Sequence, residues 1–253
     1  MSDPFSCEVR ELHNETLPPK EFVYIASNEV IPANVVRTLK SNTIPRACHL
    51  GVSGWYNFDI AVIRGSERII IVDINPDQVA FMKQTLIAIV NASHRSQFVR
   101  GILEYIDRNT IRYGEPRTNT SKFFDYNLNR MDCNREDPSS VIYDELNRDG
   151  SWLSSDQSYR YIRQLALDDR IAVLTTNVAH VHTFASIIGT IYKYNYELDT
   201  VYVSNVPGRL QPADLKLFIL TLRILHPRIL IWATPDLVQR VDVNQLAIVY
   251  DTW

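Results

Sequence analysis

The chain has 253 residues, of which 45% are apolar and 22% are charged, and these are the proportions of an ordinary globular protein. The formal net charge is -3 and the pI is near 6.1, so composition gives no electrostatic reason to expect binding to nucleic acid or to an anionic membrane. Lys, Arg and Pro residues interrupt the most apolar stretch, residues 215–232, whereas a membrane span needs about twenty nearly uncharged residues. We therefore expect a single domain without a transmembrane segment.

The cysteines and the start of the chain predict the cellular compartment. The three cysteines are widely separated and include no CxxC pair, which is typical of reduced thiols. The chain starts with Met1-Ser2-Asp3-Pro4 and does not resemble a secretory signal, which has a basic segment before an apolar core. Both features predict a cytoplasmic protein.

The first third of the chain predicts a helical lead-in at residues 22–45, followed by alternating strands and helices. A short strand at residues 46–50 is expected to stop at Gly51, and a helix follows at residues 55–64. The sequence RIIIVD at residues 68–73 is typical of a parallel strand that is buried on both faces. Asn75 is the expected N-cap of the next helix and Pro76 its first residue, because this pair is a common helix start.

Residues 94–150 interrupt the alternation, since apolar periodicity weakens and Arg, Asn, Asp, Pro and Gly accumulate. We interpret this segment as a polar insertion with one or two helices that covers, or stands beside, the carboxyl edge of the sheet as a lid. A peripheral surface excursion is the competing interpretation. Alternation then resumes, with expected helices at residues 154–167, 181–194 and 212–225 and expected strands at residues 171–176, 200–204, 228–233 and 245–250.

This element order predicts an α/β fold with a mostly parallel sheet, helices on both faces and a ligand site beyond the carboxyl ends of the strands. Glycines there let the backbone approach a ligand, and an acidic side chain after the second strand can accept hydrogen bonds from both ribose hydroxyls. The loop GVSG lacks the third glycine of GxGxxG, so a mononucleoside fits better than a dinucleotide. The residues at the ends of the predicted strands, or directly after them, are Gly51 to Gly54, Asp73, Asn177, Ser204 with Asn205, and Thr234.

Two segments resemble a known family. HLGVSGWYNFDIAVIRGSERIIIVDINPDQVAFMKQTLIAI is similar to the first two motifs of class I S-adenosylmethionine-dependent methyltransferases, especially the branch that resembles betaine-lipid synthases. LDTVYVSNV resembles the fourth-strand motif of that branch, in which a similar Ser-Asn pair follows the strand. The resemblance implies a Rossmann-like methyltransferase fold with S-adenosylmethionine as the cofactor.

The resemblance also implies site residues. It places the methionine moiety near Gly51, Ser53 and Gly54 and the ribose on Asp73. Asn177 stands where many members have Asp, and the bulky pair Trp55-Tyr56 after the loop is unusual and would narrow the methionine channel. The expected cofactor-binding residues are Gly51, Ser53, Gly54, Asp73, Asn75, Asn177, Ser204 and Asn205, and the catalytic candidates are His180, Asn205 and Tyr56.

Several alternatives stay open at this point. His180 and His182 form an HxH pair, but no neighbouring carboxylate or cysteine completes a metal site, so we favour a loop, core or pocket-rim role. The function that we expect is transfer of a methyl or aminocarboxypropyl group to a small-molecule or lipid acceptor. An inactive methyltransferase-like binding or regulatory protein is the second hypothesis, and an NAD-dependent oxidoreductase is the third.

Overall fold

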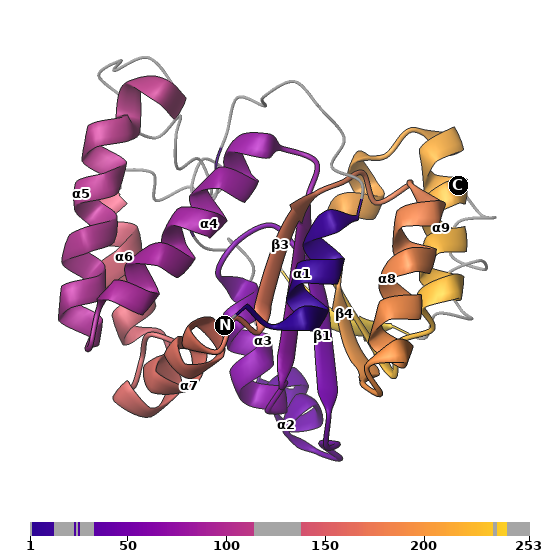
Figure 1. The fold of residues 1–253 in the computed structure, drawn as a ribbon, viewed down its shortest axis with the longest axis horizontal. Coiled ribbons are helices and arrows are strands. Elements are labelled where there is room, and N and C mark those ends of the chain that lie inside the picture. The colour runs from indigo at the N-terminus through magenta and orange to yellow at the C-terminus, as the bar shows by residue number, and fades with distance from the viewer. Residues whose placement is uncertain are drawn as a thin grey trace.

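A six-stranded sheet with the order β3-β2-β1-β4-β5-β6 forms the centre of the computed structural model, which describes residues 2–12, 23, 25, 33–113, 138–234 and 237–241 (Figure 1). The first five strands are parallel, and the sixth pairs with β5 in the antiparallel direction. The order 3-2-1-4-5 of the parallel strands is a Rossmann-like topology. The strands are β1 (Ala47–Val52), β2 (Arg68–Asp73), β3 (Ile171–Thr175), β4 (Glu197–Tyr202), β5 (Ile229–Thr234) and β6 (Leu237–Val241).

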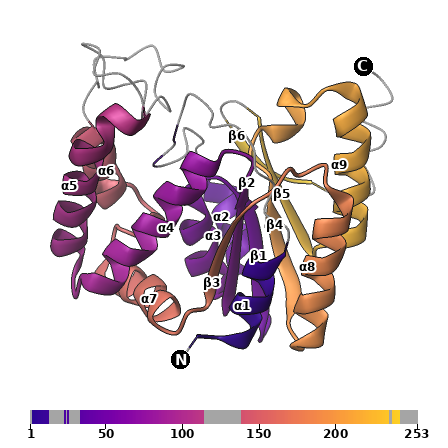
Figure 2. The same ribbon diagram turned by 45° about the horizontal axis from the view of Figure 1, so that its top comes forward.

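Helices cover both faces of this sheet (Figures 1 and 2). One face packs against α1 (Pro4–Glu11), α8 (Val181–Lys193) and α9 (Pro212–Leu225). The other face packs against α2 (Ala33–Lys40), α3 (Tyr56–Arg64), α4 (Pro76–Asn91) and α7 (Asp156–Leu167). Two further helices, α5 (Arg95–Tyr113) and α6 (Pro138–Asn147), form an outer layer beside α4, and a short 3-10 helix, η3 (Val206–Arg209), follows β4.

Strand β2 explains why both layers are needed. Ile69 and Ile71 belong to the apolar cluster on the α3 and α4 side, whereas Ile70 and Val72 belong to the cluster on the α1, α8 and α9 side. Successive side chains of a strand point to opposite faces, so this continuous β-branched run buries apolar surface on both faces. The sequence pattern predicted this strand with the bounds that the structure has.

The start of α4 also agrees with the prediction. Asn75 has an extended backbone, its side chain accepts a hydrogen bond from the Asp77 N–H group, and Pro76 is the first helical residue. The cap satisfies one of the N–H groups that a helix start leaves without a partner. This local signal fixes the chain direction immediately after Asp73.

Other bounds differ from the expected ones. Strand β1 does not stop at Gly51: it continues through Val52, because Gly51 and Val52 pair with Ile71 and Val72 of β2. Strand β4 begins at Glu197 and ends at Tyr202, and α1 was not predicted. Within the expected lead-in at residues 22–45, the described helix is α2 alone, and the expected strand at residues 245–250 lies outside the described residues.

The segment at residues 94–150 contributes to the core. Its described parts are α5, α6 and the turn that leads to α7, while residues 114–137 lie outside the described residues. Phe98, Ile102 and Ile142 have no exposed surface and belong to the cluster that packs on β2. The described helices stand beside α4 and are part of the packed layer (Figure 2).

Among the described helices, none is both long enough and apolar enough to cross a membrane.

Candidate functional site

The carboxyl ends of β3, β2, β1 and β4 lie in line along one edge of the sheet. The Ser53 N–H group donates to the Val72 carbonyl at 3.1 Å, and the Thr176 N–H group donates to the Asp73 carbonyl at 2.9 Å. Gly51 pairs with Ile71 on one side and with Tyr202 on the other. The strand order reverses between β1 and β4, and ligands of open α/β sheets bind beyond the carboxyl ends at such a point.

Both strands at this reversal end in a serine with a left-handed backbone. Ser53 has φ 68° directly after β1, and Ser204 has φ 51° shortly after β4. A positive φ is uncommon for residues other than glycine and has an energetic cost, and five other described residues share it, namely Asn42, Arg46, Asp169, Asn195 and His226. Both serines are partly exposed and lie at the edge where a ligand is expected.

Asp73 is the acidic residue of this edge. Its Oδ1 atom accepts a hydrogen bond from the Asn75 N–H group at 2.7 Å, and no described Lys, Arg or His forms an ion pair with it. Burial raises the pKa of Asp73 to about 7, although N–H groups of Asn75 and Ile74 stabilise the ionised form. A partly exposed carboxylate that lacks a cation in the described chain can accept hydrogen bonds from a ligand.

The other strand-end residues have local partners. The Asn177 side-chain oxygen accepts from the Ala179 N–H group at 2.9 Å, and the Asn75 side chain is used by the cap of α4. His180 Nδ1 lies 2.6 Å from Thr183 Oγ1 at the start of α8. Asn205 precedes η3 and its carbonyl accepts from the Gly208 N–H group. These contacts fix the turns that surround the strand ends.

Trp55 and Tyr56 point into the core. Trp55 has no exposed surface, donates from Nε1 to Thr85 Oγ1 at 3.1 Å and stacks on Phe81. Tyr56 is 2% exposed and its ring lies 5.2 Å from that of Tyr202. The expectation that this pair narrows a ligand channel was therefore wrong, because the first turn of α3 directs both rings inward. The catalytic candidate Tyr56 lies in this packed layer.

A buried polar chain beneath the loop was not anticipated from the sequence. His49 Nδ1 lies 2.7 Å from Thr200 Oγ1, and His49 Nε2 lies 3.0 Å from Asn57 Oδ1. The Asn57 amide donates to the carbonyls of Val52 and Gly54 at 2.9 and 2.8 Å. Burial lowers the pKa of His49 to about 4, so the ring is neutral at physiological pH. A histidine inside an apolar strand, followed by Asn at the start of the next helix, is the sequence signal that points to this chain.

Gly51 belongs to the same arrangement. A Cβ atom at this position would lie 1.9 Å from Asn57 Oδ1 and 3.1 Å from His49 Nε2. The structure therefore gives a packing reason for glycine here, whereas the sequence interpretation was a close approach of backbone to ligand. Gly54 follows Ser53 and is itself buried.

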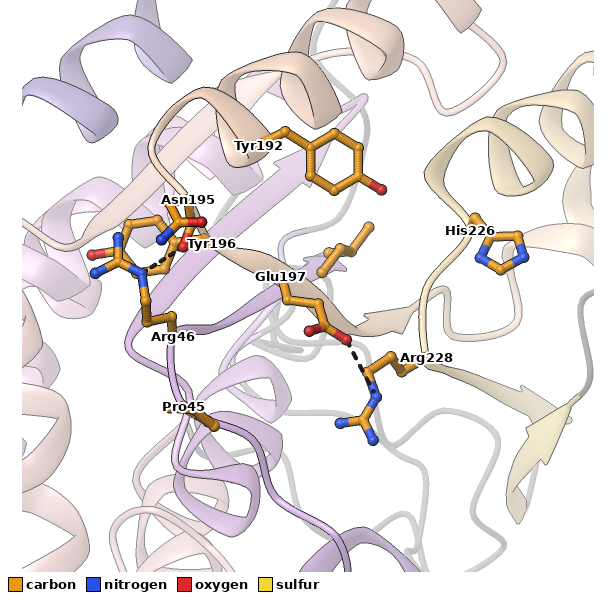
Figure 3. A pocket seen from close by; sticks show the side chains of 9 residues that line it. Pro45, Arg46, Tyr192, Asn195, Tyr196, Glu197, His226 and Arg228 are labelled. Atoms are coloured by element: carbon orange, nitrogen blue, oxygen red, sulfur yellow. Dashed lines mark hydrogen bonds and ion pairs between the residues drawn. The ribbon is translucent and has the colours of Figure 1, made fainter.

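A cavity of about 640 Å³ opens at the opposite, amino edge of the sheet (Figure 3). Arg46 lies over the ring of Tyr196 and donates to the carbonyls of Tyr194 and Asn195. Glu197 points toward Arg228, and their ion pair spans 3.4 Å (Figure 3). Because both guanidinium groups already have partners and most of the lining is exposed, the strand-end edge is the stronger candidate site.

No group of three or more His, Cys, Asp and Glu side chains is placed to hold a metal ion within the described residues. His180 is half-buried and His182 is exposed on the first turn of α8.

The fold and the strand-end edge define a Rossmann-like α/β domain with a candidate ligand site at its topological switch point. The chain belongs to the family described as domain of unknown function DUF7790, whose model matches residues 24–208. This range includes β1 to β4 and the strand-end residues from Gly51 to Asn205, whereas Thr234 lies beyond it. No curated protein matches the chain.

Proposed function

We propose that this domain binds S-adenosylmethionine at the carboxyl edge of its sheet and transfers a methyl or aminocarboxypropyl group to a small-molecule or lipid acceptor. The observation that carries the proposal is the position of Asp73. It ends the strand next to β1, its carboxylate lacks a cation among the described residues, and the Ser53 turn lies beside it. Carboxylates in this position accept hydrogen bonds from ribose hydroxyls.

The residues at this edge fit a nucleoside with a charged tail. Asp73 would hold the ribose, and the turn at Ser53 would face the methionine moiety. Thr176 adds a buried hydroxyl, which has no hydrogen-bond partner within the described residues and directly follows β3. A polar atom of this kind favours a ligand that completes its hydrogen bonding. When bound, S-adenosylmethionine would supply the alkyl carbon that an acceptor nucleophile attacks, and the sulfur would leave as a neutral thioether.

The sixth strand favours a mononucleoside over a dinucleotide. The usual dinucleotide-binding sheet has two mononucleotide halves in the order 3-2-1-4-5-6. Here β6 is antiparallel to β5, so the second half lacks its third parallel strand. Together with the loop GVSG, which lacks one glycine of the dinucleotide fingerprint, this arrangement weighs against the oxidoreductase hypothesis.

A second candidate function, ligand binding without turnover, is favoured by the surroundings of the catalytic candidates. Tyr56 is packed in the core, and His180 is engaged by Thr183. Methyl transfer needs in-line positioning more than a general base, so this observation does not decide between the two functions. Mass spectrometry of products formed from S-adenosylmethionine and candidate acceptors separates them.

Calorimetry with S-adenosylmethionine, S-adenosylhomocysteine and NAD tests the binding step. We expect the first two ligands to bind and Asp73→Ala to weaken both by about 100-fold or more, because two hydrogen bonds to a charged acceptor are lost. Asp107→Ala, which removes an exposed carboxylate from α5, is the matched control and should bind as the wild type does. Equal affinity in the Asp73 variant, or binding of NAD alone, would overturn the proposal.

A further inference from the structure

We propose that the buried chain Thr200–His49–Asn57 is a positioning device, which holds the turn at Val52 to Gly54 in the conformation that binds the ligand. This inference rests on the proposed function, because it assumes that the ligand contacts this turn. The three side chains have no exposed surface, so these hydrogen-bonded residues support the turn from inside the protein and do not contact the ligand.

The direction of each hydrogen bond follows from the geometry. The Asn57 amide nitrogen lies within 2.9 Å of two carbonyl oxygens, those of Val52 and Gly54, so this end of the side chain donates. Its oxygen therefore faces His49 and accepts from Nε2–H. The other ring nitrogen, Nδ1, then accepts from the Thr200 hydroxyl. This single arrangement satisfies the neutral imidazole and both amide hydrogens of Asn57.

The two carbonyls that Asn57 binds flank Ser53. Ser53 has a positive φ of 68°, a backbone conformation that residues other than glycine adopt at an energetic cost. A hydrogen bond to a carbonyl on each side of Ser53 restricts the backbone rotation that would relieve this strain. The Asn57 amide therefore stabilises the left-handed turn at the end of β1.

Thr200 connects the turn to the neighbouring strand. It is the residue of β4 that pairs with His49 of β1, so this link crosses the point where strand order reverses. Changing Thr200 therefore changes the turn through two intervening side chains and without touching the ligand. This separation allows a test in which the altered atom lies away from the binding site.

The test compares Thr200→Val, which removes the hydroxyl and keeps the shape, with Thr200→Ser, which keeps the hydroxyl. Thr221→Val is the matched control, because Thr221 is buried and its hydroxyl has no hydrogen-bond partner within the described residues. Two quantities are measured for each protein. They are the exchange rates of the Ser53 and Trp55 amide hydrogens without ligand, and the Kd of S-adenosylhomocysteine.

In Thr200→Val we expect amide exchange at Ser53 and Trp55 to rise, and the Kd to increase, each by about tenfold, which corresponds to the loss of one buried hydrogen bond. Both amides donate to backbone carbonyls, so their exchange reports opening of the turn. The Ile71 amide in β2 reports global unfolding, and its rate should change less. Thr200→Ser should restore both quantities to within about twofold of the wild type, since it restores that bond. Thr221→Val should leave them unchanged.

The inference is overturned if Thr200→Val leaves the exchange of Ser53 and Trp55 unchanged, if Thr200→Ser behaves like Thr200→Val, or if Ile71 accelerates by the same factor. A wild type that binds no S-adenosylhomocysteine would refute the proposed function, while the exchange rates would still decide whether the chain holds the turn. Should Thr200→Val fail to fold, Thr200→Cys replaces it, because a thiol is a much weaker donor in a small buried side chain.

Discussion

Gly51 and Asn57 fit together only because residue 51 has no side chain, since a Cβ atom there would lie 1.9 Å from Asn57 Oδ1. Neither residue can move freely, because Gly51 is paired on both sides in the sheet and Asn57 is bonded to three partners. The glycine and the polar chain beneath the loop therefore form one packing unit.

Gly51→Ala should lower the free energy of unfolding by about 2–4 kcal/mol, because overpacking displaces Asn57 and leaves buried polar groups without partners. Gly189→Ala in α8 is the control: a Cβ there meets nothing within 4 Å, and Ala is the better helix former. Urea unfolding monitored by circular dichroism measures both variants. A Gly51→Ala protein as stable as the wild type would contradict the packing argument.

Asp73→Asn should stabilise the protein without ligand at pH 8 while it weakens ligand binding. The pKa of Asp73 is about 7 in the folded state, whereas its ordinary value is 3.8. Between these values the folded state holds a proton that the unfolded state has lost, so the contribution of Asp73 to stability falls as pH rises from about 4 to 7. Asparagine does not titrate, so its contribution to stability does not change with pH. At pH 8 the free energy of unfolding of Asp73→Asn should exceed that of the wild type by about 1–2 kcal/mol, after allowance for the partial exposure of residue 73.

Urea unfolding of wild type and Asp73→Asn at pH 5 and pH 8 checks this prediction. The difference in free energy of unfolding between the two proteins should be smaller at pH 5 than at pH 8. Burial lowers the pKa of His49 to about 4, which changes stability with pH in the opposite sense, but both proteins contain His49 and the comparison cancels its effect. Asp107→Asn controls for the loss of an exposed negative charge. A destabilised Asp73→Asn protein at pH 8 would show that this carboxylate has a structural role instead.

Local signals in the sequence were sufficient for much of the fold and for part of the candidate site. The run RIIIVD predicted β2, and Asn75-Pro76 predicted the start of α4, because both patterns depend on neighbouring residues alone. These two features together place Asp73 at a strand end. The positions of Ser53 and Ser204 at the same edge followed from the alternation of strands and helices.

Features that depend on distant residues were missed. His49 and Thr200 are 151 positions apart, and their contact exists only because β1 lies next to β4. The end of β1 was misplaced because a glycine reads as a turn, whereas here it accommodates Asn57. The burial of Phe98 was not predicted because the polar composition of residues 94–150 indicated an insertion, whereas Phe98, Ile102 and Ile106 of α5 are buried.

Asp199→Asn should lower the free energy of unfolding by about 3–5 kcal/mol, because it leaves the buried guanidinium of Arg64 without its carboxylate partner. Both side chains have no exposed surface, and two hydrogen bonds of 2.6 and 2.8 Å join them. Arg64 also donates to the Ser41 carbonyl and so connects the end of α3 to the segment after α2.

The matched control for Asp199→Asn is Glu104→Gln in the exposed pair of Glu104 with Arg108, where we expect a change within about 0.5 kcal/mol. Thermal and urea unfolding of both variants give the comparison. Similar losses of unfolding free energy in the two variants would mean that burial does not make the loss of the Arg64 partner more costly.

The helices of residues 94–150 should be required for stability, and Phe98 tests this. Its ring lies 5.5 Å from that of Trp55 and 5.2 Å from that of Trp152, in a cluster that packs on β2. Phe98→Ala should therefore cost about 3–5 kcal/mol, as removal of a buried ring does. Tyr143→Ala on α6 is the control, because Tyr143 is 52% exposed, and it should cost less than about 0.5 kcal/mol. If urea unfolding gives equally small losses for both, α5 acts as a separable lid and not as part of the core.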